Sequence, residues 1–143
     1  MKNYVLDSYA VLTYLQNEAG ADRVEALLAE AQSGRVCLYL SAVNFGEVAY
    51  IVQRKAGAEG LRSLLLALDT LPLRIVDATR ELALRAAGIK AKAAIAYADC
   101  FAVALAQSLD ASVVTGDPEF GGVAALVSVE WLPPNHLSAP SES

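Results

Sequence analysis

The chain contains an almost uncharged run at residues 93–106, Ala93-Ala94-Ile95-Ala96-Tyr97-Ala98-Asp99-Cys100-Phe101-Ala102-Val103-Ala104-Leu105-Ala106, in which Asp99 is the only charged residue. A helix that is apolar on every face belongs in a protein core. The sequence therefore predicts a buried helix over residues 97–109 that carries a carboxylate. Such a carboxylate must meet a cation, accept several hydrogen bonds or stay protonated, although Asp99 could instead cap the start of the helix.

Short apolar strands alternate with longer amphipathic helices before and after this run. The expected strands cover residues 3–6, 36–40, 73–76, 112–115 and 127–131. The expected helices begin at a cap on Ser8, cover 22–32, extend from a cap on Ser41 to about 55, cover 59–68, extend from Asp77 or Thr79 to about 90, and cover 97–109. This alternation is typical of an α/β fold, here a three-layer α/β/α sandwich with a mostly parallel, Rossmann-like central sheet.

The length of 143 residues suits one domain with a sizeable core. A composition that is 55% hydrophobic and 19% charged excludes intrinsic disorder and polar low-complexity sequence. We expect one domain over residues 1–132 and a Pro- and Ser-rich tail over residues 133–143. The only histidine, His136, lies in that tail, where we expect it to be solvated rather than catalytic.

Two features of the chain argue against contact with a membrane. No run reaches the roughly 20 apolar residues that a spanning helix needs. Asp7 follows the first residue too closely for the apolar segment of a signal peptide. We therefore expect a cytoplasmic protein.

Three further acids stand where carboxylates are unusual. Asp7 and Asp117 follow predicted strands, and Glu47 lies among apolar residues inside a predicted helix, with Asn44 on its face. Each has a simpler interpretation: Asp7 could cap a helix, Asp117 could serve a turn, and Glu47 could be solvated. Ligands of open parallel sheets bind outside the carboxyl ends of the strands. Because all four acids could meet at that edge, we interpret Asp7, Glu47, Asp99 and Asp117 as one site.

Four carboxylates without a histidine or cysteine cluster favour a hard cation, Mg²⁺ or Mn²⁺. Such an ion lowers the pKa of bound water and clamps a phosphate, so phosphoryl chemistry needs no histidine base. Thr115 and Ser8, close in sequence to the acids, are candidates to orient water or a carboxylate, and Asn44 is a third supporting polar residue.

At these positions the sequence resembles the PIN-domain family, particularly the VapC-type toxins of bacterial toxin–antitoxin pairs. The resemblance covers essentially residues 1–132. It rests on four segments in the family's order and spacing: Asp7-Ser8, Ser41-Ala42-Val43-Asn44-Phe45-Gly46-Glu47-Val48, Tyr97-Ala98-Asp99-Cys100-Phe101-Ala102-Val103-Ala104-Leu105-Ala106 and Val114-Thr115-Gly116-Asp117-Pro118-Glu119-Phe120.

The resemblance implies a metal-dependent endoribonuclease that is inhibited by a cognate antitoxin and is commonly a homodimer. Matched position by position, the acidic quartet would be Asp7, Glu47, Asp99 and Asp117, with Thr115 as a supporting polar residue. The sequence departs from the family at two places. Gly116 stands where the family often has Arg, and Glu119 stands where a further Asp is frequent, so the role of Glu119 is open.

The net charge of −5 by itself argues against a nucleic-acid ligand. The charges are unevenly distributed, however. Residues 54–92 hold eight basic and four acidic residues, a net charge of +4, and the rest of the chain has a net charge of −9. RNA could follow this basic flank to an acidic metal site, with Arg85, Lys90 and Lys92 nearest in sequence to Asp99, although these could also be solvated helix charges.

Two other functions fit the same pattern of acids. One is a phosphotransfer domain of similar fold, but Tyr9 stands where haloacid-dehalogenase-type phosphatases need a second Asp, and the Lys that receiver domains need after a late strand is missing. The other is a binding module without catalytic activity, in which the acids are structural.

Overall fold

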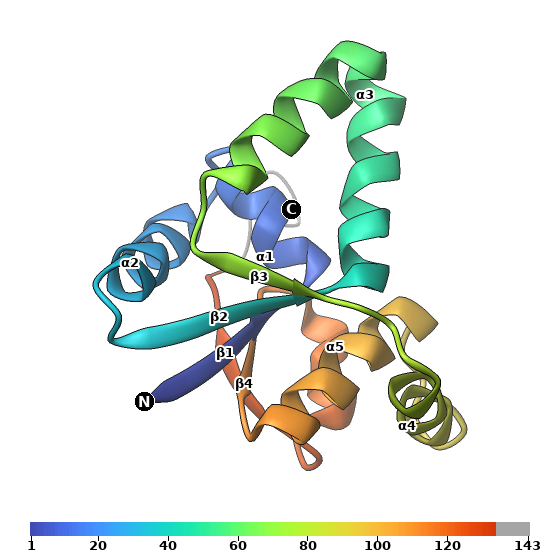
Figure 1. Cartoon of the computed structure of the whole chain (residues 1–143). Coiled ribbons are helices and arrows are strands. Elements are labelled where there is room, and N and C mark those ends of the chain that lie inside the picture. The colour runs from blue at the N-terminus through green and yellow to red at the C-terminus, as the bar shows by residue number, and fades with distance from the viewer. Residues whose placement is uncertain (134–143) are drawn as a thin grey trace, which may run out of the picture.

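A sheet of five parallel strands passes through the centre of the molecule (Figure 1). The structure is a computed structural model and describes residues 1–133. The strands are β1 (Lys2–Leu6), β2 (Val36–Ser41), β3 (Leu73–Val76), β4 (Ser112–Thr115) and β5 (Ser128–Trp131), in the order β3-β2-β1-β4-β5. The expected strands and their parallel arrangement are confirmed.

Helices cover both faces of this sheet. They are α1 (Ser8–Leu15), α2 (Ala21–Gln32), α3 (Ala42–Asp69), α4 (Arg80–Lys90) and α5 (Tyr97–Leu109), and a 3₁₀ helix η1 (Pro118–Val123) follows β4. Figure 1 shows α1, α2 and α3 on one face and α4 and α5 on the other. The predicted three-layer α/β/α sandwich is therefore confirmed.

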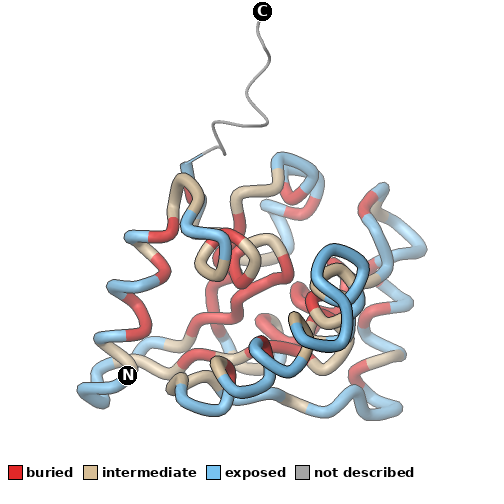
Figure 2. Tube along the Cα trace, turned by 90° about the horizontal axis from the view of Figure 1, so that it is seen from above, coloured by how far each residue is buried: buried red, intermediate tan, exposed pale blue. Residues whose placement is uncertain are grey.

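The alternation of side chains along the strands supplies a separate core to each face. Val5 of β1 and Val113 of β4 pack with α4 and α5. Leu6 and Val114, the next residues along the same strands, pack instead with α1, α2 and α3. Residues 99–106 of α5 are all buried, and Figure 2 shows such buried segments at the centre of the molecule.

The two helices expected over 41–55 and 59–68 are confirmed as the two arms of α3. The arms meet at a kink at Gly57, a non-helical residue with a φ of 67° that glycine adopts readily. One predicted detail is wrong, at the start of α1. The residue that caps α1 is Asp7, and Ser8 is already helical. The helix predicted over 97–109 is confirmed as α5, and residues 93–96 of the apolar run precede it.

The strand order reverses beside β1. From β1 the chain builds outward to β2 and β3, and then returns to add β4 and β5 on the other side. Asp7 directly follows β1 and Asp117 lies two residues beyond β4, so these acids flank the reversal at the carboxyl edge. Open α/β sheets bind ligands at this point.

Within residues 1–133, none of the helices is long and apolar enough to cross a membrane. The predicted tail lies outside the described residues apart from Pro133, and so does His136.

Candidate active site

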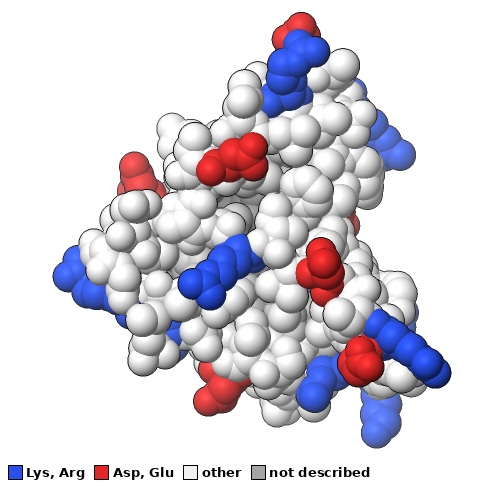
Figure 3. All heavy atoms as spheres, in the orientation of Figure 1, with Lys and Arg blue, Asp and Glu red and all other residues white. Residues whose placement is uncertain are grey.

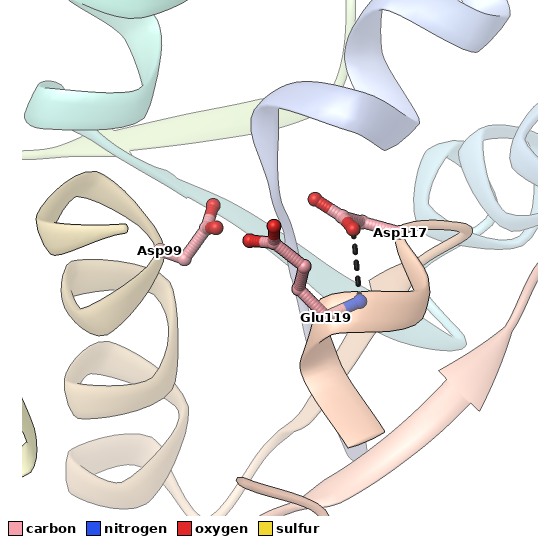
Figure 4. Close-up of side chains that lie close together, drawn as sticks. All are labelled: Asp99, Asp117 and Glu119. Atoms are coloured by element: carbon pink, nitrogen blue, oxygen red, sulfur yellow. Dashed lines mark hydrogen bonds between the residues drawn. The ribbon is translucent and has the colours of Figure 1, made fainter. Parts of the chain in front are cut away.

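Three carboxylates converge at the carboxyl edge of the sheet. Asp99, Asp117 and Glu119 each offer an oxygen, and these oxygens all lie within 4.8 Å of one another. Asp99 comes from the first turn of α5, and Figure 4 shows it facing the other two across the gap between α5 and η1. Two of the four predicted acids therefore meet directly, and Glu119, whose role the sequence left open, is the third member.

Local hydrogen bonds shape the loop that carries Asp117 and Glu119. Asp117 Oδ1 accepts a hydrogen bond of 2.9 Å from the Glu119 amide and so caps η1 (Figure 4). The Asp117 amide donates to Thr115 Oγ1 at 3.0 Å. The turn interpretation of Asp117 is thus correct, and the same turn brings Glu119 back toward Asp99.

Asp7 lies beside this cluster and is buried, with 1% of its surface exposed. Its Oδ1 accepts a hydrogen bond of 2.8 Å from the Ala10 amide, which is the cap of α1. Its Oδ2 accepts a hydrogen bond of 2.5 Å from Thr115 Oγ1. Each oxygen keeps further lone-pair capacity, so the capping interpretation of Asp7 does not exclude a second role.

Burial sets the protonation of two of these acids. It raises the pKa of Asp7 to about 8, an effect to which the charges of Asp99 and Asp117 add and which the hydrogen bonds from Thr115 and Ala10 oppose. Burial also raises the pKa of Asp99 to about 7, and the neighbouring charges, first that of Asp117, add to this rise. A divalent cation would stabilise the ionised forms of both carboxylates.

Glu47 lies half-buried on α3, outside the group of three converging oxygens. Its Oε1 accepts a hydrogen bond of 2.5 Å from Ser8 Oγ. Its charge also contributes to the raised pKa of Asp99. The structure therefore places Glu47 near Asp99 and holds it through Ser8, the residue that follows Asp7.

The acids have no basic partner in the described part of the chain. The ion pairs there are Arg23–Glu130 and Arg62–Glu59, and neither involves the site. Buried carboxylates that lack a counter-charge are costly to ionise. The three converging oxygens lie within 4.8 Å of one another, which is on the scale of the roughly 4 Å that separates opposite ligands of an octahedral Mg²⁺. A donor set made of oxygens only thus fits Mg²⁺ or Mn²⁺.

The geometry agrees with the comparison to known protein families. The model of the PIN domain matches residues 4–126. The chain belongs to the PIN-domain family. The comparison with curated proteins found no match to this chain.

Solved structures share the PIN fold of this chain. VapBC2 from Rickettsia felis, solved with a fragment of promoter DNA, is 18% identical to this chain and superposes with a TM-score of 0.71. The match covers 91% of this chain and 98% of the Rickettsia chain. FitAcB from Neisseria gonorrhoeae is 23% identical with a TM-score of 0.66, covering 88% and 95%. VapC20 of Mycobacterium tuberculosis, a sarcin-ricin loop cleaving toxin, is 14% identical with a TM-score of 0.67, covering 82% and 92%.

A close contact in this PIN domain accounts for one departure from the family pattern. A Cβ at Gly116 would lie only 2.5 Å from Cε1 of Tyr9. The Tyr9 ring therefore occupies the space that a side chain at position 116 would need. The sequence alone does not pair Gly116 with Tyr9, because the contact joins the start of α1 to the loop after β4.

The three predicted RNA-binding residues lie at α4 and the turn after it. Lys90 Nζ donates to the Ile95 carbonyl at 2.7 Å, Arg85 Nη1 donates to Gln107 Oε1 at 3.4 Å, and Lys92 is exposed. In Figure 3 basic side chains gather at the lower right, over α4. The bond from Lys90 brings a positive charge beside the segment that leads into α5 and Asp99.

Proposed function

We propose that this PIN-domain protein is a metal-dependent endoribonuclease, the toxin of a toxin–antitoxin pair, and that it hydrolyses RNA phosphodiester bonds. One observation carries the proposal: Asp99, Asp117 and Glu119 converge at the strand-order reversal of a PIN fold, without a basic partner among residues 1–133. Oxygen ligands at such a position suit Mg²⁺ or Mn²⁺ and phosphoryl chemistry.

Asp99, Asp117 and Glu119 would hold the ion directly, with Asp7 and Glu47 beside them. When bound, the ion supplies water of lowered pKa and offsets the charge of the phosphate. The protein contributes the positions of the acids. Thr115 fixes Asp7 through its hydroxyl, and Ser8 fixes Glu47. Hydroxyl groups that hold carboxylates in this way orient the acids of a metal site and tune their basicity.

The RNA would approach over the basic side chains of α4. Arg85, Lys90 and Lys92 would contact phosphates, which position the strand without reading its sequence. The acids offset by a divalent cation would then face the scissile phosphate, so a net charge of −5 does not oppose RNA binding.

The partner would be an antitoxin protein. Several solved structures with the same fold are toxin–antitoxin complexes, among them one from Klebsiella pneumoniae. This likeness supports a cognate antitoxin for the present chain, which would act in the cytoplasm. A homodimer, which the family resemblance implies, belongs to the same proposal.

Cleavage assays on total RNA and on structured RNAs test the proposal. We expect cleavage with Mg²⁺ or Mn²⁺, none with EDTA, and a loss of at least about a hundredfold in Asp7→Asn and Asp99→Asn. Glu59→Gln, which alters an exposed acid paired with Arg62 on α3, is the matched control and should cleave normally. A folded wild-type protein that cleaves no RNA with either metal would contradict the proposal and favour a binding module.

A further inference from the structure

Asn44 is fully buried near the start of α3, and its amide is bonded on both sides. Its Oδ1 accepts a hydrogen bond of 2.7 Å from Ser41 Oγ. Its Nδ2 donates to Ser8 Oγ and to the Ala98 carbonyl, each at 3.2 Å. One side chain of α3 therefore reaches α1 and α5 at once.

The bond to Ser8 leads to Glu47. The Ser8 hydroxyl has one proton to donate. Its contact with Glu47 Oε1, at 2.5 Å, is much shorter than its contact with the backbone carbonyl of Asn44, at 3.3 Å. The Ser8 hydroxyl therefore donates its proton to Glu47 Oε1, while a lone pair on Ser8 Oγ accepts the hydrogen bond from Asn44 Nδ2. Asn44 thus sets the direction of the bond that holds the Glu47 carboxylate.

The bond to Ala98 leads to Asp99. Ala98 immediately precedes Asp99 in the first turn of α5. The Asn44 amide holds this turn against α3 across 54 residues of sequence. A change at Asn44 would therefore disturb the acid on α3 and the acid on α5 together.

We propose that Asn44 is a positioning residue that sets the placement of Glu47 and Asp99 and thereby the affinity for the divalent cation. This inference rests on the proposed metal site. Asn44 itself would contact neither the ion nor the RNA. Partners that act through the ligands of a metal typically change its affinity by about 10- to 100-fold when they are removed.

The chain offers a matched control at the opposite end of α5. Asn3 Nδ2 donates to the carbonyl of Leu109, the last residue of α5, at 3.0 Å. Asn3→Ala and Asn44→Ala each remove an amide that holds one end of the same helix. Only Asn44 also contacts Ser8, so the two variants separate general support of α5 from placement of the acids.

The experiment measures the affinity for Mn²⁺ alone, from the electron paramagnetic resonance signal of the free ion, in the full chain. Urea unfolding in EDTA measures stability without metal. We expect Asn44→Ala to bind Mn²⁺ at least about tenfold more weakly than the wild type and Asn3→Ala within about twofold, although both lose stability. Asn44→Ala that folds and binds Mn²⁺ like the wild type would overturn the inference.

Ser8→Ala provides a second test if Asn44→Ala does not fold. It cuts the path from Asn44 to Glu47 and leaves the bond to Ala98, and it should also weaken Mn²⁺ binding. Unchanged affinity in Ser8→Ala would then overturn the inference. A wild-type protein that binds no Mn²⁺ would instead contradict the proposed metal site itself, so the two failures are distinguishable.

Discussion

Thr115 Oγ1 donates a hydrogen bond of 2.5 Å to Asp7 Oδ2 across 108 residues of sequence. The same oxygen accepts a hydrogen bond of 3.0 Å from the Asp117 amide. One buried hydroxyl therefore connects the acid that follows β1 with the loop after β4, on the two sides of the strand-order reversal. Thr115 thus fixes Asp7 and the Asp117 loop relative to each other.

Thr115→Val tests this connection, because it keeps the shape of the side chain and removes the hydroxyl. Asp7 then loses one of its two donors, which should cost about 1–3 kcal/mol of stability, and RNA cleavage should fall at least about tenfold. Urea unfolding and a cleavage assay measure the two effects. Ser112→Ala, which breaks a hydroxyl pair with Ser128 at the other end of β4, is the control. Equal cleavage by Thr115→Val and the wild type would show that the bond has no role in activity.

The pH dependence of stability follows from the two raised pKa values. Asp7 titrates at about 8 in the folded state and Asp99 at about 7, against an ordinary value of 3.8. At pH values between the ordinary pKa and the raised pKa of each carboxyl, the folded protein binds more protons than the unfolded chain. The free energy of unfolding therefore falls as the pH rises through this range. In EDTA we expect lower stability at about pH 8 than at about pH 5, and Asp7→Asn should reduce that difference.

Mn²⁺ should reverse this trend, because it binds the ionised carboxylates of the folded state only. The stabilisation by Mn²⁺ should therefore be larger at about pH 8 than at about pH 5. Urea unfolding at both pH values, with Mn²⁺ and with EDTA, measures it. An Asp7→Asn variant with the same pH profile as the wild type in EDTA would be inconsistent with a raised pKa at Asp7.

Gly116→Ala tests the contact with Tyr9. The added Cβ would lie 2.5 Å from the Tyr9 ring, so the ring or the Asp117 loop must move. We expect a loss of about 1–3 kcal/mol of stability and weaker Mn²⁺ binding. Adding Tyr9→Ala to the same chain should restore part of both. Gly121→Ala, in η1 with open space around its Cβ, should change neither; if Gly116→Ala behaves like it, the contact does not constrain the loop.

Neutralising Arg85, Lys90 and Lys92 together to Gln tests the RNA path. We expect weaker RNA binding and a smaller dependence on salt, because up to three phosphate contacts disappear, with Mn²⁺ affinity unchanged. Filter binding over a series of salt concentrations measures this. Lys2→Gln with Arg35→Gln, near the amino ends of β1 and β2, is the control. An unchanged salt dependence in the triple variant would place the RNA elsewhere.

The sequence predicted what local pattern determines. The periodicity of apolar residues located the strands and helices, and Asp99 stood out as the only charged residue in the apolar run that forms most of α5. The convergence of Asp99 with Asp117 also followed from the parallel topology, since strand ends share one edge. Asp7 and Ser8 are both good caps, so pattern alone chose the wrong one.

The remaining parts of the site depend on tertiary contacts. Glu119 joins the cluster only because Asp117 caps a 3₁₀ helix that turns the chain back. The reach of Asn44 to Ala98 and the contact of Tyr9 with Gly116 join distant segments, which a single sequence does not pair.

The oxygen that enters the cleaved phosphate tests the proposed hydrolysis most directly. An RNA that the wild-type protein cleaves is digested with Mn²⁺ in ¹⁸O-labelled water, and the new ends are analysed by mass spectrometry. Because the metal-bound acids would activate water, the proposed mechanism predicts a linear terminal phosphate that carries labelled oxygen at first cleavage. A 2′,3′-cyclic phosphate without label would mean attack by the RNA's own 2′-hydroxyl and would contradict it.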